Sequence, residues 1–391
     1  MTTRLYRLDA YQTQFTSAVL ETRARQDRTE IRLEETAFYP TAGGQACDTG
    51  VLAGARVVET LEDDDGSLWH ALEGDVPALG SRVSGQVDWA RRRDHMQQHT
   101  GEHMLGQAFY RVNRHVVAVN MEGRVCTLDL AGDVSWDVAL EAERLTNEMI
   151  WSALPITTYE IPDTEIERVP LRRTPKVSGQ IRVVQIGDFD YSACGGTHLR
   201  NSAEVGMLKI TSNSRKPVAR TPACTSNCGA RLLADYGFKH EFVAALGLRF
   251  STALERVPER TESALEELNA AKREVAALRT RLAQEIVAGL SGVVLRTLED
   301  AALLPELAKV CAAKPGVTAI LGATDGSRVL LAVACGAGVN AKAGELLKLG
   351  LPFVDGRGGG KPELAQGSGT RLEGLNDALE AMRVAAVERA S

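Results

Sequence analysis

The segment HMQQHTGEHM, residues 95–104, decides how this chain can be interpreted, because it holds three of the seven histidines at intervals of four residues. These are His95, His99 and His103. A helix over residues 94–113 is predicted from the spacing of the apolar residues, which are Met96, Met104, Leu105, Ala108 and Phe109. Residues four apart share one face of a helix. His99 and His103 are therefore predicted to present two imidazoles to the same side, which is a common way for a helix to bind zinc.

A second motif, CGGTH, lies about ninety positions downstream. Its two glycines are predicted to form a tight turn with positive φ, which would bring the Cys194 thiolate and the His198 imidazole together. A ligand set of imidazoles and one thiolate suits zinc, which takes borderline-soft ligands in tetrahedral geometry. The two motifs together predict one zinc site made of His99, His103, Cys194 and His198.

Three neighbouring features receive other interpretations. His95 is expected to support the site from outside the ligand set or to lie in an interface. Glu102 stands between the two helical ligands, but a metalloprotease needs glutamate directly after the first histidine, where this chain has Thr100. Cys224 and Cys228 form a C-x₃-C pair with no second ligand pair nearby, so the pair has no assigned role.

The composition is that of an ordinary globular protein. The chain has 391 residues, which predicts two or three domains, with 44% hydrophobic and 25% charged residues. Its net charge of −6 argues against a general nucleic-acid binder, since phosphate contacts need lysine and arginine. Arg91, Arg92 and Arg93 form one local basic cluster, interpreted as a solvated turn.

Two features of the sequence predict a cytoplasmic protein with no membrane partner. The N-terminal stretch has no apolar core of the kind found in signal peptides, and no apolar run approaches the roughly 18 residues of a membrane span. The seven cysteines, an odd number, are scattered. In a reducing compartment such cysteines are metal ligands, catalytic groups or buried side chains.

Residues 4–90 are predicted to form a small β-barrel, because short alternating strands are separated by turn residues. Within this region the loop after residue 36 contains Gly43-Gly44, which allows close approach of the backbone. Thr41, Gln45 and Asp48 add polar groups beside these glycines. Taken by itself, this stretch could be either part of a functional site or an ordinary hairpin with a turn.

The middle of the chain mixes helix and strand, which predicts an α+β fold. Residues 124–132 are predicted as a strand and residues 136–153 as an amphipathic helix, with Ser135 or Asp137 as its N-cap. Residues 179–198 run from a strand into the CGGTH loop.

The last third changes character. Residues 256–290 are rich in Ala, Glu, Leu and Arg, and apolar residues recur every three or four positions, which predicts a long helix or coiled-coil arm. Residues after 290 alternate between strands and helices, as an α/β domain does. The glycine-rich stretch 356–369 offers backbone amides, with Arg357 and Lys361, to a phosphate, or is a structural turn; it departs from the Walker pattern at Pro362.

These motifs together resemble the alanyl-tRNA editing proteins of the AlaX type, in their long form with a C-terminal DHHA1 domain, and the related editing domain of alanyl-tRNA synthetase. The resemblance implies a β-barrel over 1–90, a zinc-dependent editing domain over 91–240, a helical or coiled-coil connector over 241–290 and a DHHA1-like α/β domain over 291–391. The stretches that carry it are FYPTAGGQACDTG, HMQQHTGEHMLGQAF, DYSACGGTHLRNSAEVGMLKI and GGGKPELAQGSG.

The resemblance implies a hydrolase that removes the wrong amino acid from tRNA(Ala) without charging tRNA itself. Ser-tRNA(Ala) is the expected substrate and Gly-tRNA(Ala) a second candidate. By this resemblance the four predicted ligands hold Zn²⁺, Thr41 helps to select serine over alanine, and Gln45 supports activity. The last domain is expected to contact the outer part of the tRNA or, with the connector, to form a homodimer.

The chain departs most from this family at residues 212–236. Relatives carry a basic strand there, whereas TPACTSN (221–227) is neither basic nor strand-like in composition. If this departure disables the site, the chain would instead be a non-catalytic zinc-containing tRNA-binding module. A phosphoesterase is a further alternative. Such an enzyme normally carries an Asp/His metal cluster before a C-terminal domain of this kind, and the sequence before residue 291 does not show one.

Overall fold

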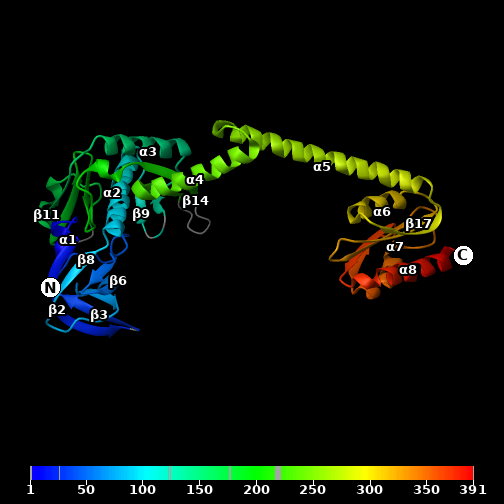
Figure 1. Ribbon diagram of the computed structural model, residues 1–391. Helices are drawn as coiled ribbons and strands as arrows, with labels where there is room; N and C mark the ends of the chain where they lie inside the picture. The colour runs from blue at the N-terminus through cyan, green and yellow to red at the C-terminus, as the bar shows by residue number, and fades with distance from the viewer. Residues whose placement is uncertain are drawn as a thin grey trace. The chain divides into compact units, whose positions relative to one another are not determined.

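The computed structural model describes residues 2–25, 27–121, 123, 125–175, 178–215 and 222–390. The chain divides into two compact units, Met1–Ala245 and Leu246–Ser391 (Figure 1). Helix α4 (Gly229–Phe250) crosses this division. The finer division into four parts stays a prediction.

The first unit begins with a closed six-stranded barrel, which confirms the small β-barrel expected from the sequence. Its core is filled by side chains such as Phe15, Ile31, Leu33 and Val57, which point inward from alternate positions. A short helix, α1 (Leu5–Leu8), precedes the barrel, flanked by the paired strands β1 (Thr3–Arg4) and β4 (Glu35–Thr36). The barrel strands, in order around it, are β2 (Gln14–Arg25), β3 (Arg28–Leu33), β7 (Leu68–Glu73), β6 (Ala55–Glu62), β5 (Gly50–Leu52) and β8 (Arg82–Val87).

Helix α2 (Trp89–Arg111) follows the barrel directly and carries the histidine motif. The expected start at residue 94 was wrong, because Asp88 caps the helix earlier by accepting the Arg91 backbone N–H. From Met96 to Leu105 every residue is buried. The helix lies inside the unit, so its histidines are held on several sides. It contacts helix α3 (Trp136–Trp151) and strands β9 (Val116–Asn120), β10 (Cys126–Leu130), β13 (Asp190–Ala193) and β15 (Pro222–Cys228).

Two antiparallel sheets and helix α3 (Trp136–Trp151) surround α2. Ser135 is the N-cap of α3 and accepts the Val138 backbone N–H, which decides between the two expected caps. The four-stranded sheet has the order β14 (Leu208–Arg215), β15 (Pro222–Cys228), β10 (Cys126–Leu130) and β9 (Val116–Asn120). The three-stranded sheet has the order β11 (Ile156–Pro162), β12 (Gln180–Ile186) and β13 (Asp190–Ala193), with short 3₁₀ turns at Asp163–Arg168 and Ser202–Val205.

The atypical segment corrects the expectation drawn from its composition. Residues 216–221 lie outside the described residues, but Pro222–Cys228 form strand β15, which pairs with both β14 and β10. A central position in a sheet thus overrides a weak strand propensity. Cys224 and Cys228, which had no assigned role, are both buried in the core cluster beside α2. Helix α4 follows at once and was also not predicted.

The basic cluster before the histidine motif is not a solvated turn. Arg92 is fully buried, and its guanidinium forms an ion pair with the equally buried Asp48 of the glycine loop. Arg92 also donates to the carbonyl oxygens of Ala10 and Ala37, and the Tyr39 backbone N–H donates to Asp48 at 2.7 Å. This network ties the glycine loop of the barrel to helix α2.

Replacing Arg92 by methionine is expected to destabilise the protein by about 3–5 kcal/mol, because the substitution leaves the Asp48 carboxylate buried without its partner. Urea unfolding followed by circular dichroism measures this loss. Arg93→Met, at the exposed neighbouring position, is the matched control and should change stability little. Equal midpoints for the two variants would contradict the role given to the buried pair.

The second unit contains the long helix predicted from the sequence, α5 (Val257–Ala288), preceded by a 3₁₀ turn at Leu254–Arg256. Its C-terminal end packs into the core of the unit through Ala283 and Val287, and Val257 at its N-terminal end is also buried. Most of its apolar stripe stays exposed, at Leu265, Leu268, Val275, Leu278 and Leu282. The homodimer expected through this connector stays a prediction.

The rest of this unit is a five-stranded sheet between two layers of helices, in agreement with the α/β character expected. One face packs on α6 (Leu304–Ala312) and the end of α5, and the other on α7 (Ala343–Gly350) and α8 (Leu375–Ala390). The strand order is β16 (Gly292–Leu298), β17 (Val317–Thr324), β18 (Val329–Cys335), β20 (Leu364–Gly369) and β19 (Arg357–Gly360). Three short 3₁₀ turns lie at Ala301–Leu303, Leu351–Val354 and Leu372–Gly374.

The glycine-rich stretch 356–369 forms the hairpin of β19 and β20. Its glycines permit close packing of the two strands, since a Cβ at Gly358 would lie 2.5 Å from Gln366 O. The stretch is therefore part of the sheet, which favours the structural interpretation over a phosphate loop. Within the described parts of the chain, no helix is both long enough and apolar enough to cross a bilayer.

Candidate metal centre

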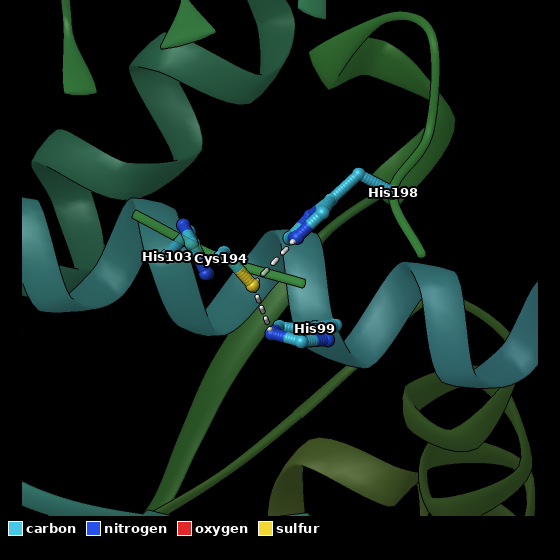
Figure 2. A group of neighbouring side chains, drawn as sticks. All are labelled: His99, His103, Cys194 and His198. Atoms are coloured by element: carbon cyan, nitrogen blue, oxygen red, sulfur yellow. Dashed lines mark hydrogen bonds between the residues drawn. The ribbon is translucent and has the colours of Figure 1, made fainter. Parts of the chain in front are cut away.

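The structure brings His99, His103, Cys194 and His198 together, with one potential ligand atom of each lying within 4.8 Å of all the others. Figure 2 shows the two histidines of α2 facing the Cys194–His198 loop. The Cys194 Sγ lies 3.3 Å from His99 Nε2 and 3.4 Å from His198 Nε2. Three of the four residues are buried and Cys194 is partly buried. The two sequence motifs thus meet in space as expected.

The glycines between Cys194 and His198 act differently from the expectation. Among the residues described with positive φ, neither Gly195 nor Gly196 appears, so the predicted positive-φ turn was wrong. Gly196 is instead required by close approach, because a Cβ there would lie 2.2 Å from the His99 ring. Arg182 of β12 holds the loop by donating to the carbonyl oxygens of Cys194 and Gly196, each at 2.9 Å.

Gln45, from the glycine loop of the barrel, orients His99. Its Oε1 accepts a hydrogen bond from His99 Nδ1 at 2.7 Å, while its Nε2 donates to Thr197 Oγ1 at 2.9 Å. An amide oxygen can only accept, so the proton of His99 lies on Nδ1 and Nε2 keeps its lone pair toward the cluster. Gln45 itself is 1% exposed. It therefore links the barrel, α2 and the CGGTH loop at one point.

Thr100 orients His198 in the same way and was missed as a site residue. Its Oγ1 lies 3.2 Å from His198 Nδ1 and accepts the Leu199 backbone N–H at 3.2 Å. In the sequence, Thr100 is notable only because it stands where a metalloprotease would have glutamate. Nothing in the spacing indicates that a threonine on α2 would contact a loop ninety-eight positions away.

Asp190, at the start of β13, is the third partner of a cluster histidine and was also missed. Its Oδ2 lies 3.4 Å from His103 Nδ1, and it accepts the Ser192 hydroxyl at 2.9 Å. Arg172 lies 3.6 Å from the other carboxylate oxygen and donates to the His103 carbonyl oxygen. All three histidines thus turn Nδ1 toward a protein group, as metal-binding histidines usually do.

The charges of the cluster favour a thiolate. Burial raises the pKa of Cys194, but the three histidines around it lower that pKa well below its usual value. Burial lowers the pKa of His103, yet the Cys194 thiolate and Asp190 raise it to about 9. Burial and the neighbouring His99 lower the pKa of His198 to about 3. Without a metal, the group therefore combines an ionised sulfur and a neutral His198 with a protonated His103, which must release its proton when a metal binds.

This arrangement fits zinc. The ligand set is three imidazoles and one thiolate, the ligand atoms converge, and the outer nitrogen of each imidazole already faces a protein partner. His103 Nδ1 and Asp190 Oδ1 are buried without an aligned hydrogen bond among the described residues. A bound cation would offset the burial of this thiolate and carboxylate.

A cavity of about 330 Å³ opens beside the cluster and is lined by His99, His103 and Cys194. Its size is at the lower end of the range for small-ligand sites, about 300–1,000 Å³. Three guanidinium groups also line it, those of Arg4, Arg7 and Arg172. Two carboxylates, Glu62 and Glu102, complete its charged wall.

Thr41 and His95 lie away from the cluster. Thr41 is exposed, its Oγ1 accepts the Cys47 backbone N–H at 3.2 Å, and it does not appear in the cavity lining, where Ala42 and Gly43 do. His95 is buried beside Arg91 and Asp94, and burial lowers its pKa to about 4. Both residues are therefore placed to support the loop or the helix rather than to touch the cluster.

Comparisons with known proteins show what this chain is similar to. Residues 181–218 match the family described as "Threonyl and Alanyl tRNA synthetase second additional domain". The alanyl-tRNA editing protein AlaX-L of Pyrococcus horikoshii is 33% identical over 219 residues, 54% of this chain and 54% of that protein. The chain is a relative of the alanyl-tRNA editing proteins. This confirms the resemblance to the alanyl-tRNA editing proteins, while its C-terminal DHHA1 part stays a prediction.

Alanine–tRNA ligases match over more of this chain. That of Pyrococcus abyssi is 31% identical over 97% of the chain and 43% of the ligase, and that of Thermococcus kodakarensis is 33% identical over 94% and 41%. The chain spans about half the length, or less, of these curated relatives.

Proposed function

We propose that this chain hydrolyses the ester bond of tRNA(Ala) that carries a wrong amino acid, with serine as the main substrate and glycine as the second. The proposal places Zn²⁺ on His99, His103, Cys194 and His198. It is supported by the similarity to a protein named for alanyl-tRNA editing. The single observation that carries it is the convergence of these four side chains beside a cavity.

In this proposal the residues around the cluster position the ester rather than attack it. When bound, zinc would supply a Lewis acid that polarises an oxygen atom in the cavity. Gln45, Thr100 and Asp190 keep the three imidazoles in the orientation that the ligand set needs. Arg7 at the cavity would attract the phosphates at the end of the tRNA, whereas Arg4 is paired with Glu62 and Arg172 donates to His103 O and Ser192 Oγ.

The test is hydrolysis of Ser-tRNA(Ala) beside Ala-tRNA(Ala) under single-turnover conditions, with zinc measured on the same sample. We expect serine to be removed, alanine to be spared and about one zinc to be bound per chain. Zinc and tRNA binding without cleavage would favour the non-catalytic binding module. Release of phosphate that depends on Mn²⁺ would favour the phosphoesterase.

Thr41→Val is expected to reduce the preference for serine over alanine. Removing Oγ1 leaves the Cys47 N–H without its acceptor and loosens the loop that carries Gln45, so the cavity should hold the serine hydroxyl less well. We expect the ratio of the two kcat/KM values to fall about tenfold. Thr41→Ser keeps the hydroxyl and is the control. An unchanged ratio in the valine variant would exclude Thr41 from selection.

For the second unit we propose a DHHA1-like domain that contacts the outer part of the tRNA, with the exposed stripe of α5 available to pair with a second copy. The support is the exposure of Leu265, Leu268 and Leu278 along one helix. Light scattering of the full chain, with and without tRNA, reports both the dimer and the complex.

A further inference from the structure

Glu102 is a buried carboxylate that is neither a proposed zinc ligand nor a partner of one of the three histidines. It lies on α2 between His99 and His103, is 4% exposed, and lines the same cavity as those two ligands. In the sequence it is a glutamate that stands at the wrong position for a metalloprotease. The structure places it in the wall of the cavity.

The two carboxylate oxygens of Glu102 are in different situations. Oε1 accepts the Ser226 hydroxyl at 2.9 Å. Oε2 is buried and has no hydrogen-bond partner among the described residues. Leaving a buried acceptor without a partner is unfavourable, and more so for a charged group. Because Glu102 is a lining residue of the cavity, a ligand donor that reaches Oε2 from the cavity would give this oxygen a partner.

The other carboxylate of the cavity is already used. Glu62 is paired with the guanidinium of Arg4, both of whose terminal nitrogens contact it. Arg172 lies at the same cavity, but its donors are directed to His103 O and Ser192 Oγ. Of the two glutamates that line this cavity, Glu102 is therefore the one with a carboxylate oxygen, Oε2, that can still accept a hydrogen bond.

We propose that Glu102 accepts a hydrogen bond from the free α-amino group of the aminoacyl ester. The inference rests on the proposed function, because it takes an aminoacyl ester as the ligand of this cavity. The α-amino group is the one donor that every aminoacyl ester carries next to its ester carbon. A hydrogen bond from this amino group to Glu102 would fix the position of the ester relative to the proposed ligands. His99 lies three residues before Glu102 on α2, and His103 lies one residue after it.

This assignment specifies the class of substrate. An ester whose amino group is acylated, as at the end of a peptidyl chain, would bring a bulky amide to Glu102 in a cavity of only about 330 Å³. A hydroxy acid ester would bring no ammonium. Aminoacyl esters with a free amine are thus bound, and N-acylated esters are excluded.

Ser226 is the positioning residue for Glu102. It belongs to β15, within the segment whose composition departs from the related proteins, and it is 1% exposed. Its hydroxyl occupies Oε1 and so leaves Oε2 for the ligand. The atypical strand therefore takes part in the site.

The experiment uses two stable adenosine probes and the full chain loaded with zinc. In the first, serine is joined to 3′-amino-3′-deoxyadenosine through an amide. The second carries 3-hydroxypropanoate instead and differs only in lacking the α-amino group. Calorimetric titration of the wild-type chain should give at least about tenfold tighter binding of the first probe, as expected for a hydrogen bond to a charged group.

Glu102→Gln should reduce this preference to within about twofold, while zinc content stays at the wild-type value. Glu62→Gln is the matched control: the same change at the carboxylate already paired with Arg4 should keep the preference. Ser226→Ala should reduce the preference in part, which provides a second variant if Glu102→Gln does not fold.

The inference is overturned if the wild-type chain binds both probes equally, binds neither, or keeps its preference in the Glu102→Gln variant. Because binding is measured without cleavage, these results are separate from the test of hydrolysis. A chain that prefers the amine-bearing probe but hydrolyses no ester would retain the inference and lose the proposed function.

Discussion

Cys194→Ala is expected to remove zinc and ester hydrolysis together. The thiolate is the one anionic ligand among the four, and the structure surrounds it with the three imidazoles of the cluster. Without it, three neutral or cationic imidazoles remain at a buried point and no longer favour a divalent cation. We expect the zinc content to fall from about one per chain to a small fraction, and kcat/KM for Ser-tRNA(Ala) to fall at least about a hundredfold.

Zinc content by mass spectrometry and single-turnover deacylation measure the two effects on the same preparation. Cys311→Ala is the matched control, since Cys311 is also buried but lies in the core of the second unit. It should leave both zinc and activity unchanged. A Cys194→Ala protein with full activity would refute the proposed ligand set.

Gln45→Leu is expected to weaken zinc binding about 10–100-fold, although Gln45 is not a proposed ligand. Leucine has a similar size but cannot accept the His99 Nδ1 proton or donate to Thr197. His99 would then lose the contact that fixes its tautomer, and the CGGTH loop would lose a bond to the barrel. Deacylation at limiting zinc should fall by a similar factor.

Competition with a zinc chelator measures this affinity. Gln14→Leu, at an exposed position of barrel strand β2, is the control and should leave the affinity as it is. If excess zinc restores full activity to Gln45→Leu, the residue acts through the metal. If activity stays low at saturating zinc, Gln45 has a direct role toward the substrate.

The sequence was sufficient for features that depend on local pattern. Spacings of four residues place His99 beside His103, and the same logic links Cys194 to His198. Alternation predicted the barrel, and the apolar repeat predicted α5, because both patterns follow from the geometry of a strand or a helix. The motifs also sufficed for the family, since their order along the chain is itself specific.

Contacts between distant segments were decided only by the tertiary structure. Thr100 and Asp190 orient His198 and His103, and Arg92 is buried against Asp48, yet each looks like an ordinary polar residue in the sequence. Pro222–Cys228 became a central strand because two neighbours supply its hydrogen bonds, which outweighs its weak propensity. The identity of the candidate ligands thus follows from local spacing. Their orientation, their charge state and the open acceptor of Glu102 arise from packing, which no local pattern encodes.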